Sequence, residues 1–332
     1  MNISIQKILY GLLVMIGIFT FSYSSKADSN DFSVIPILPE NQNKDVFSYF
    51  DLTVVPNQKQ ELKIKVTNNS NESVKYNIYV NTATTNQNGI LDYSISEFEK
   101  DESMKLSVKE CVYAEETRIE LPPESSKDVT LRLSIPASPF EGIALGGITV
   151  EPVIDDKKEG ISNLFTRTLA LQLSESKENI VPKLEGGAVL VSQENLRNNV
   201  KFELRNTTPV IIPKVKAEIT ILKQGSKTPI VEETKEQLSF APNSKFGLMT
   251  EWKQQFDPGN YTYNINLKDE KGHSWKFTKE FEIKDEVAKD LNEKSVDVKD
   301  NTIWIYLIIP FILLVVALLS MLYILIKKKM SK

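Results

Sequence analysis

Residue types that carry chemistry in enzymes and metalloproteins are scarce in this chain of 332 residues. It contains one cysteine, Cys111, and one histidine, His273. A single cysteine excludes an internal disulfide, and one cysteine with one histidine cannot supply the ligand cluster of a zinc site. A Cys111–His273 dyad would require two distant parts of the chain to meet, and a strand cysteine with a turn histidine is the simpler interpretation. We therefore expect no catalytic residue, no metal site and no cofactor.

A strong excess of one charge is also missing. The chain has 40 Lys and Arg against 44 Asp and Glu, for a net charge of −4, and 41% of its residues are hydrophobic. This is an ordinary globular composition, and without a basic stripe we expect no nucleic-acid partner. The acidic residues are scattered, and Asp155-Asp156 lacks the spacing of a calcium-binding loop. A binding function is therefore favoured over catalysis.

The longest hydrophobic run lies near the C-terminal end. Residues 303–326 are almost entirely apolar, and four lysines lie in residues 327–332. About 24 residues at about 1.5 Å each span roughly 36 Å, enough to cross a hydrocarbon core of about 30 Å. Lysines beside a span favour the cytoplasmic side. The sequence predicts a single transmembrane helix over residues 303–326, a cytoplasmic basic tail over residues 327–332, and a cell-membrane protein whose N-terminal part lies outside.

The N-terminal end has the pattern of a secretory signal. Lys7 precedes a hydrophobic stretch from Ile8 to Phe21, and Ser25-Lys26-Ala27 supplies small residues for cleavage. We predict a signal peptide over residues 1–27, with an uncleaved first anchor as the alternative. No LPxTG-like motif precedes the C-terminal hydrophobic segment, which favours a retained anchor. The shortage of cysteine indicates a bacterial rather than a eukaryotic surface protein.

Apolar residues alternate with polar ones along many short segments, and helical periodicity is scarce. This pattern is typical of strands that bury one face, so we predict an all-β fold of sandwiches. The clearest segments are Leu62–Val66, Tyr76–Val80, Val129–Ile135, Leu169–Leu173, Val200–Leu204, Tyr261–Leu267 and Trp275–Ile283.

A charged stretch divides the strand-rich region. Asp155–Gly160 contains breakers between strand-like runs and predicts a boundary between a first domain, 28–155, and a second, 160–284. In the alternative, this stretch is a hairpin tip and Leu164–Leu173 pairs back onto the first domain. Residues 285–302 alternate acids and lysines, which indicates a charged stalk, partly helical, before the membrane.

The segment Thr84–Tyr93 is a first candidate for ligand binding. Asn88-Gly89 suits a tight turn with positive φ angles. The amides of Asn86 and Asn88, together with the ring of Tyr93, can hydrogen-bond and stack on a sugar. The alternative is a turn selected for backbone geometry alone.

A second candidate is Phe140, in a segment rich in proline and glycine. Gly142, Gly146 and Gly147 interrupt an apolar stretch, and glycines in such a place usually mark a bulge or the close approach of another backbone. Phe140 lies beside the turn, either exposed for a ligand or covering the end of the sandwich.

A third candidate is a short apolar segment between two prolines. Pro209 and Pro213 flank Val210, Ile211 and Ile212, a pattern that suits a protected edge strand. Such an edge can bind a partner by strand addition. A loop that crosses the end of the sandwich is the alternative.

Several of these segments occur in an order that resembles WxL-interacting proteins, a family of Gram-positive cell-surface proteins. In the first half the resemblance rests on Phe32–Gln42, Tyr49–Leu52, Gln60–Asn68, Thr84-Thr85-Asn86-x-Asn88-Gly89 and Phe140-x-Gly142-x-x-Leu145-Gly146-Gly147-Ile148. In the second half it rests on Leu238–Phe246, Trp252, Pro258-Gly259-x-Tyr261 and Trp275–Phe281.

This resemblance implies two immunoglobulin-like β-sandwich domains in tandem. The first would bind peptidoglycan. The second would bind host extracellular proteins, and secreted WxL-domain proteins are expected partners. Since the second domain precedes the membrane segment, we expect it to meet bacterial partners first. The alternative is an extracytoplasmic assembly chaperone or protein adaptor without affinity for murein.

Overall fold

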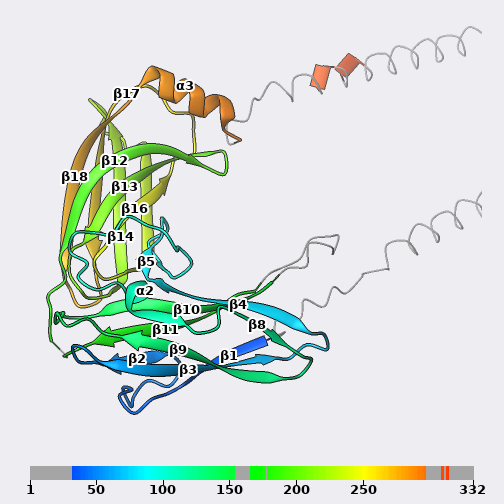
Figure 1. Cartoon of the computed structure of the whole chain (residues 1–332). Helices are drawn as coiled ribbons and strands as arrows, with labels where there is room; N and C mark the ends of the chain where they lie inside the picture. The colour runs from blue at the N-terminus through cyan, green and yellow to red at the C-terminus, as the bar shows by residue number, and fades with distance from the viewer. Residues whose placement is uncertain (1–31, 154–164, 177, 297–307, 310–311, 314–332) are drawn as a thin grey trace, which may run out of the picture.

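The computed structural model describes residues 32–153, 165–176, 178–296, 308–309 and 312–313 (Figure 1). The predicted signal peptide, the Asp155–Gly160 stretch, the basic tail and most of the predicted membrane segment lie outside these residues. Within the described ranges, no helix has both the length and the apolar character needed to span a membrane. The all-β prediction is confirmed, because strands in two sandwiches account for most of the described chain.

The first sandwich packs two sheets around one core. Alternation produces this core directly, since Leu62, Ile64 and Val66 of β3 are at most 1% exposed. One sheet has the order β1 (Phe32–Ile37), β3 (Lys59–Asn68), β9 (Ser126–Ser134), β7 (Val112–Ala114). The other has the order β2 (Phe50–Thr53), β11 (Arg167–Ser174), β10 (Ala144–Pro152), β4 (Val74–Thr82), β8 (Arg118–Leu121).

The second sandwich has its own core and follows the first along the chain. Phe202, Phe240 and Tyr263 are completely buried in it. One sheet has the order β12 (Leu184–Glu194), β13 (Arg197–Asn206), β16 (Ser244–Glu251). The other has the order β15 (Val231–Phe240), β14 (Ile212–Lys223), β17 (Gly259–Lys268), β18 (Ser274–Ile283).

The two sandwiches share a strand order and one buried hydrogen-bonding arrangement. β1-β3-β9 corresponds to β12-β13-β16, and β11-β10-β4-β8 corresponds to β18-β17-β14-β15. The last residues of β3 and β13 are Asn68 and Asn206, both completely buried. Asn68 Nδ2 donates to the Leu121 carbonyl at 3.1 Å, and Asn206 Nδ2 donates to the Ala241 carbonyl at 2.8 Å. In each sandwich the asparagine ties one sheet to the residues that end a strand of the other.

The strand β11 belongs to the first sandwich. It pairs antiparallel with β10 and parallel with β2, and Leu171 and Leu173 are buried in the first core. The hairpin interpretation that the sequence left open therefore describes this part of the chain. The first sandwich ends after Ser174, and the second begins with β12.

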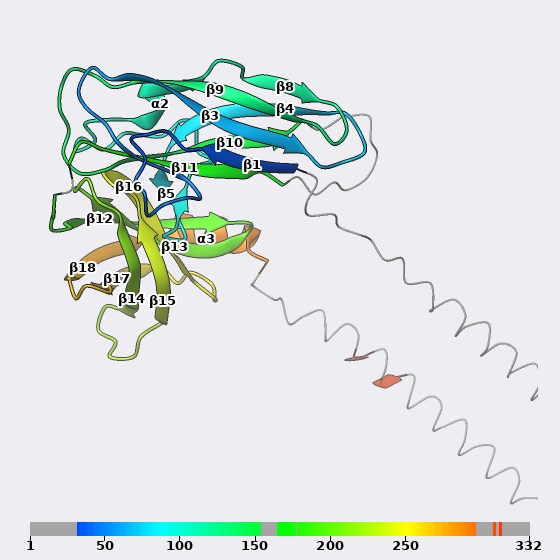
Figure 2. The same ribbon diagram turned by 90° about the horizontal axis from the view of Figure 1, so that it is seen from below.

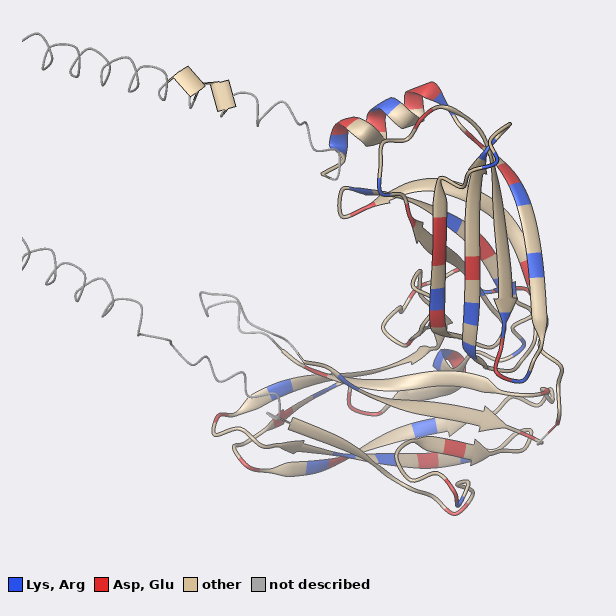
Figure 3. Ribbon diagram, turned by 180° about the vertical axis from the view of Figure 1, so that it is seen from behind, with Lys and Arg blue, Asp and Glu red and all other residues tan. Residues whose placement is uncertain are grey.

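The start of the predicted stalk is folded onto the second sandwich. Helix α3 (Asp285–Lys294) buries Ala288 at 2% exposure and packs Leu291 against the core. Asn292 Oδ1 accepts a hydrogen bond from the N–H of Phe256, and Asn292 Nδ2 donates to the Phe256 carbonyl, both at 2.8 Å. Acidic and basic residues alternate along the rest of α3 (Figure 3). The helix lies at the end of the second sandwich that is remote from the first (Figure 1).

Candidate functional site

A hairpin from the first sandwich reaches across to the second. Strands β5 (Thr84–Thr85) and β6 (Leu91–Asp92) form this hairpin, and β5 lies beside β16 (Figures 1 and 2). The carbonyl of Gln87 accepts the N–H of Met249 in β16 at 2.8 Å. The carbonyl of Gly89 accepts the N–H of Ser239 in β15 at 2.7 Å. The tip of the hairpin therefore bridges the two edge strands on one side of the second sandwich.

Buried polar and apolar contacts support the same junction. Thr85 Oγ1 accepts the N–H of Ala241 at 2.9 Å and lies 3.0 Å from Ser244 Oγ. Both contacts are buried, where an unpaired polar group costs free energy, so they favour one relative position of the sandwiches. A small apolar cluster lies next to them and contains Ala83, Leu91, Tyr93, Leu145, Ile143, Ile211 and Ala241.

A second point of close approach lies at Gly142. Its φ of +67° is favourable for glycine, and a Cβ built there would lie 2.3 Å from the Pro209 carbonyl oxygen. The next residue, Ile143, donates its N–H to that carbonyl at 2.7 Å. Here the glycine is required because the backbone of the second sandwich occupies the place of a side chain.

An ion pair joins the two sandwiches beside the hairpin. Asp101 accepts from Arg205 Nε at 2.6 Å and from an Arg205 terminal nitrogen at 3.1 Å. The Asp101 side chain is 2% exposed. Hydrogen bonds from Arg205 hold the pKa of Asp101 at about 2, well below its ordinary value. Asp101 therefore stays ionised and paired over the whole physiological range.

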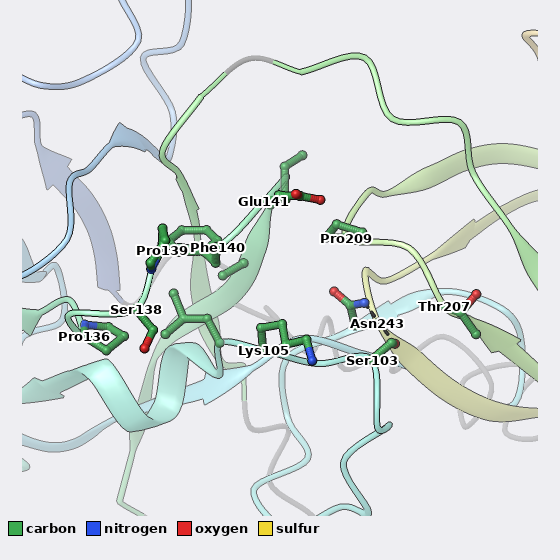
Figure 4. A pocket seen from close by; sticks show the side chains of 13 residues that line it. Ser103, Lys105, Pro136, Ser138, Pro139, Phe140, Glu141, Thr207, Pro209 and Asn243 are labelled. Carbon is green, nitrogen blue, oxygen red and sulfur yellow. Dashed lines mark hydrogen bonds between the residues drawn. The ribbon is translucent and has the colours of Figure 1, made fainter.

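These contacts surround a pocket of about 650 Å³ between the sandwiches (Figure 4). The volume lies within the range of about 300–1,000 Å³ that is typical of small-molecule sites. One wall consists of residues of the first sandwich, chiefly Pro139, Phe140 and Leu106. The opposite wall comes from the second sandwich and includes Thr207 and Pro209. Both sandwiches are needed to form the pocket.

Polar and charged groups converge on this pocket. Asn243 is 7% exposed, and its Nδ2 donates to Ser103 Oγ at 2.9 Å across the junction. Lys105 and Glu141 are exposed and line the pocket from the first sandwich. Within the part of the chain that the structure describes, neither forms an ion pair. In Figure 4 the Lys105 side chain extends toward Ser103, and the Glu141 carboxylate lies on the side of Pro209. Among the described residues, the pocket thus offers one cation and one anion that form no ion pair.

The predicted ligand residues Asn86 and Asn88 lie at the tip of the hairpin. Asn86 Oδ1 accepts the N–H groups of Asn88 at 2.9 Å and Ile90 at 3.2 Å, so the side chain holds the turn. Asn88 is exposed. Turn geometry accounts for Asn86, and sugar binding by these amides stays a prediction.

The structure brings two other predicted residues together, Tyr93 and Ile211, in the apolar cluster at the junction. Gly147 makes room for Tyr93, because a Cβ there would lie 2.8 Å from the Tyr93 ring. Phe140 is 8% exposed and both joins the first core and lines the pocket. It therefore covers the end of the sandwich.

The remaining predicted residues, Val210 and Ile212, lie at the start of β14, in the four-stranded sheet of the second sandwich. Val210 precedes β14, and its carbonyl accepts from Asn206 at 2.8 Å. Ile212 is the first residue of β14, is completely buried and pairs with Phe240 of β15. β14 lies between β15 and β17 in the sheet order, so the edge-strand prediction is wrong, and the loop alternative describes Val210 and Ile211. Partner binding along this segment stays a prediction.

Sequence patterns did not identify the polar residues of the pocket. Ser103, Lys105 and Asn243 lie in loops without periodicity, and they meet only because two domains meet. The one available signal was Gly142, which predicted either a bulge or the approach of another backbone, and the structure shows the approach. No pattern named the partner backbone, Pro209.

Cysteine and histidine lie in separate sandwiches. Cys111 is 4% exposed in the first core, and burial raises the pKa of its thiol to about 11. His273 lies in the β17–β18 turn, where its Nδ1 is 2.6 Å from Asp269 Oδ2. Across the described ranges, no group of three or more His, Cys, Asp or Glu side chains is arranged to hold a metal ion.

Two family models match the chain. Residues 32–152 match the peptidoglycan binding domain of WxL Interacting Protein, and residues 156–293 match the host binding domain of WxL Interacting Protein. The second match includes β11, which pairs within the first sandwich. No curated protein matches the chain.

Several solved structures are similar in fold at low identity. The CsuC-CsuE chaperone–tip adhesion subunit complex of Acinetobacter baumannii has 13% identity and a TM-score of 0.33, with 74% of this chain and 97% of that chain covered. The DraB chaperone of E. coli has 14% identity and a TM-score of 0.30, with 76% and 98% covered. The CupB2 chaperone of Pseudomonas aeruginosa has 11% identity and a TM-score of 0.27, with 66% and 91% covered. Likeness at this level concerns the fold alone.

Proposed function

The chain belongs to the family of WxL-interacting proteins, and on this premise we propose that it is a Gram-positive surface protein that binds peptidoglycan through the first of two immunoglobulin-like sandwiches. The observation that carries the proposal is the match of residues 32–152 to the family's peptidoglycan-binding domain. Both matched models describe binding domains rather than enzymes. The protein would then bind the cell wall without cleaving or modifying it.

The second sandwich is the proposed site for protein partners. Its match to the host-binding domain supports a protein ligand, either a secreted WxL-domain protein or a host protein. The hairpin tip already occupies the β15 edge at Ser239 and the β16 edge at Met249. A partner of the second sandwich would therefore use its remaining surface.

Membrane anchoring is the third part of the proposal. The apolar run over residues 303–326 and the basic residues after it support a single C-terminal span with the sandwiches outside. Helix α3 lies at the end of the second sandwich remote from the first (Figure 1). The second sandwich would then stand next to the membrane, and the first would reach outward into the wall.

Sedimentation with purified sacculi tests the murein part. Full-length protein in detergent is mixed with Gram-positive sacculi and centrifuged, with and without a WxL-domain protein. We expect the protein to sediment on its own and to be released when the sacculi are digested with a muramidase. Sedimentation only in the presence of the WxL-domain protein would instead identify an adaptor without murein affinity.

Surface access tests the arrangement along the membrane normal. Antibodies against each sandwich are applied to intact cells and to cells with digested walls. We expect the second sandwich to be labelled only after wall digestion. Ready labelling of the second sandwich on intact cells would contradict this arrangement.

A further inference from the structure

The junction pocket carries a pattern of groups that fits one part of peptidoglycan better than the other. Its charged groups are Lys105 and Glu141, of opposite sign, and among the described residues neither has an ion-pair partner. Free charges that face a partly enclosed pocket favour a ligand with complementary charges, because charge-assisted hydrogen bonds are the stronger ones. The pocket therefore favours a ligand that carries both a carboxylate and an amine.

The apolar part of the pocket argues against a sugar ring. Many sugar-binding sites stack a ring face on an exposed aromatic side chain, and the lining contains one aromatic residue, Phe140. Phe140 is only 8% exposed, so its ring offers no open face. Leu106, Ile143 and Pro209 supply small apolar patches instead, which suit methyl groups.

We propose that this pocket binds the stem peptide of peptidoglycan rather than its glycan chain. The inference rests on the proposed murein-binding function. Stem peptides are short, carry alanine methyl groups and free carboxylates, and in the lysine type carry a free amine before cross-linking. Lys105 pairs with a stem carboxylate, and Glu141 pairs with the stem amine. The methyl groups contact Leu106 and Ile143.

The second sandwich completes this site. Thr207, Pro209 and Asn243 line the pocket opposite the first sandwich. Asn243 and Ser103 already share a hydrogen bond of 2.9 Å across the junction, at the place where a peptide amide would lie. Recognition of the stem peptide thus requires that the two sandwiches stay in contact. The family model assigns peptidoglycan binding to the first sandwich alone.

Calorimetry with a soluble stem pentapeptide of the lysine type tests the proposal. Full-length protein in detergent is titrated with this peptide, with the same peptide acetylated at the lysine amine, with the same peptide amidated at the C-terminus, and with a tetramer of N-acetylglucosamine. We expect the unmodified peptide to bind and the sugar tetramer not to compete. Charge-assisted contacts contribute enough that each modification should weaken binding about tenfold.

Two variants assign the contacts. Glu141→Gln should weaken binding of the unmodified peptide about as much as acetylation does, and acetylation should then have no further effect. Lys105→Ala should weaken binding of the unmodified peptide about as much as C-terminal amidation does, and amidation should then have no further effect. Both side chains are exposed, so the fold should tolerate the changes, and a thermal unfolding scan verifies it. Glu286→Gln and Lys289→Ala on α3 are matched controls, because they make similar changes of charge on exposed residues outside the pocket.

The outcomes separate this inference from the murein-binding proposal. If the protein sediments with sacculi but the peptide does not bind, or if the sugar tetramer displaces the peptide, the stem-peptide assignment is refuted and murein binding stands. If the two pocket variants bind the peptide as the α3 controls do, the assignment to this pocket is refuted. If the protein binds neither sacculi nor peptide, the murein-binding proposal itself is refuted.

Discussion

Replacing Gly142 by alanine tests whether the two sandwiches behave as one unit. Gly142 adopts a φ of +67°, which L-residues rarely adopt, and its missing side chain faces the second sandwich. A Cβ there would lie 2.3 Å from the carbonyl oxygen of Pro209 and 2.8 Å from its Cγ. Neither atom belongs to a flexible side chain, so the two backbones must separate.

The expected cost has two parts. An alanine in the left-handed region costs about 1–2 kcal/mol. Forcing an extra carbon into a packed contact costs about 1–3 kcal/mol. If the junction opens instead of straining, the second part is replaced by the lost junction contacts, including the hydrogen bond from Ile143 to Pro209. We therefore expect Gly142→Ala to cost about 2–5 kcal/mol in total.

Gly225→Ala is the matched control. Gly225 also has a positive φ, +82°, but a Cβ there would meet nothing within 4 Å. Only the backbone part of the cost applies, about 1–2 kcal/mol. The difference between the two variants measures the contact with Pro209.

Amide hydrogen exchange shows where the cost falls. The N–H groups of Ile143, Ser239 and Met249 all donate across the junction. We expect these amides to lose protection in Gly142→Ala by about 30-fold for each 2 kcal/mol of coupling lost. Amides in the two cores should change much less. Equal losses in Gly142→Ala and Gly225→Ala, with the junction amides unaffected, would refute a tight junction.

Three further predictions concern buried groups. Because Arg205 holds the pKa of Asp101 near 2, against about 3.9 for an unfolded Asp, this pair contributes roughly 2 kcal/mol above about pH 4 that is lost as the pH falls toward 2. Asp101→Asn should remove that pH dependence from the unfolding free energy, and an unchanged acid limb would contradict the pairing. Tyr263→Phe should destabilise by about 1–3 kcal/mol, because it leaves the buried Thr250 hydroxyl without its 2.7 Å partner; adding Thr250→Val should recover part of the loss in chemical denaturation. Burial and a thiol pKa of about 11 should keep Cys111 from reacting with a thiol reagent at pH 8 until the protein unfolds, and rapid labelling of the native protein would count against this.

Strand content was predictable because alternation is local. Leu62, Ile64 and Val66 alternate with lysines, and the structure buries the three apolar side chains in β3. Only one face of such a strand can meet a core, so the pattern specifies both the strand and its inner face. The glycine at position 142 was informative in the same local way, since it predicted either a bulge or a close approach of backbone, and the structure shows the close approach.

The end of the first domain was harder to predict. The charged stretch Asp155–Gly160 was predicted to be a domain boundary, with a hairpin tip as the alternative, and the structure places the strand that follows it in the first sandwich. The decision depends on the pairing of β11 with the preceding strand β10 and with β2, which lies far from it in the sequence. Hydrogen bonds between distant strands leave no periodic signal in the sequence.

The residues of the candidate site also divide into those that the sequence singled out and those that only the structure identified. Phe140 was singled out from its proline- and glycine-rich surroundings, and it does line the pocket. Lys105 and Asn243 were not singled out, because isolated polar residues in loops look alike in sequence. Asn86 holds its own turn, a role that depends on the geometry of the hairpin, and its predicted contact with a ligand stays a prediction.

The amino-acid order alone determined the all-β class, the family and a hydrophobic segment of membrane-spanning length, since each depends on residue types along neighbouring positions. Only the tertiary structure decided where the first sandwich ends, that the 84–92 hairpin binds the second sandwich, and that residues from both form one pocket. The physical reason is that these features arise from contacts between residues far apart in the chain, whose free energy depends on distances that only the folded molecule specifies.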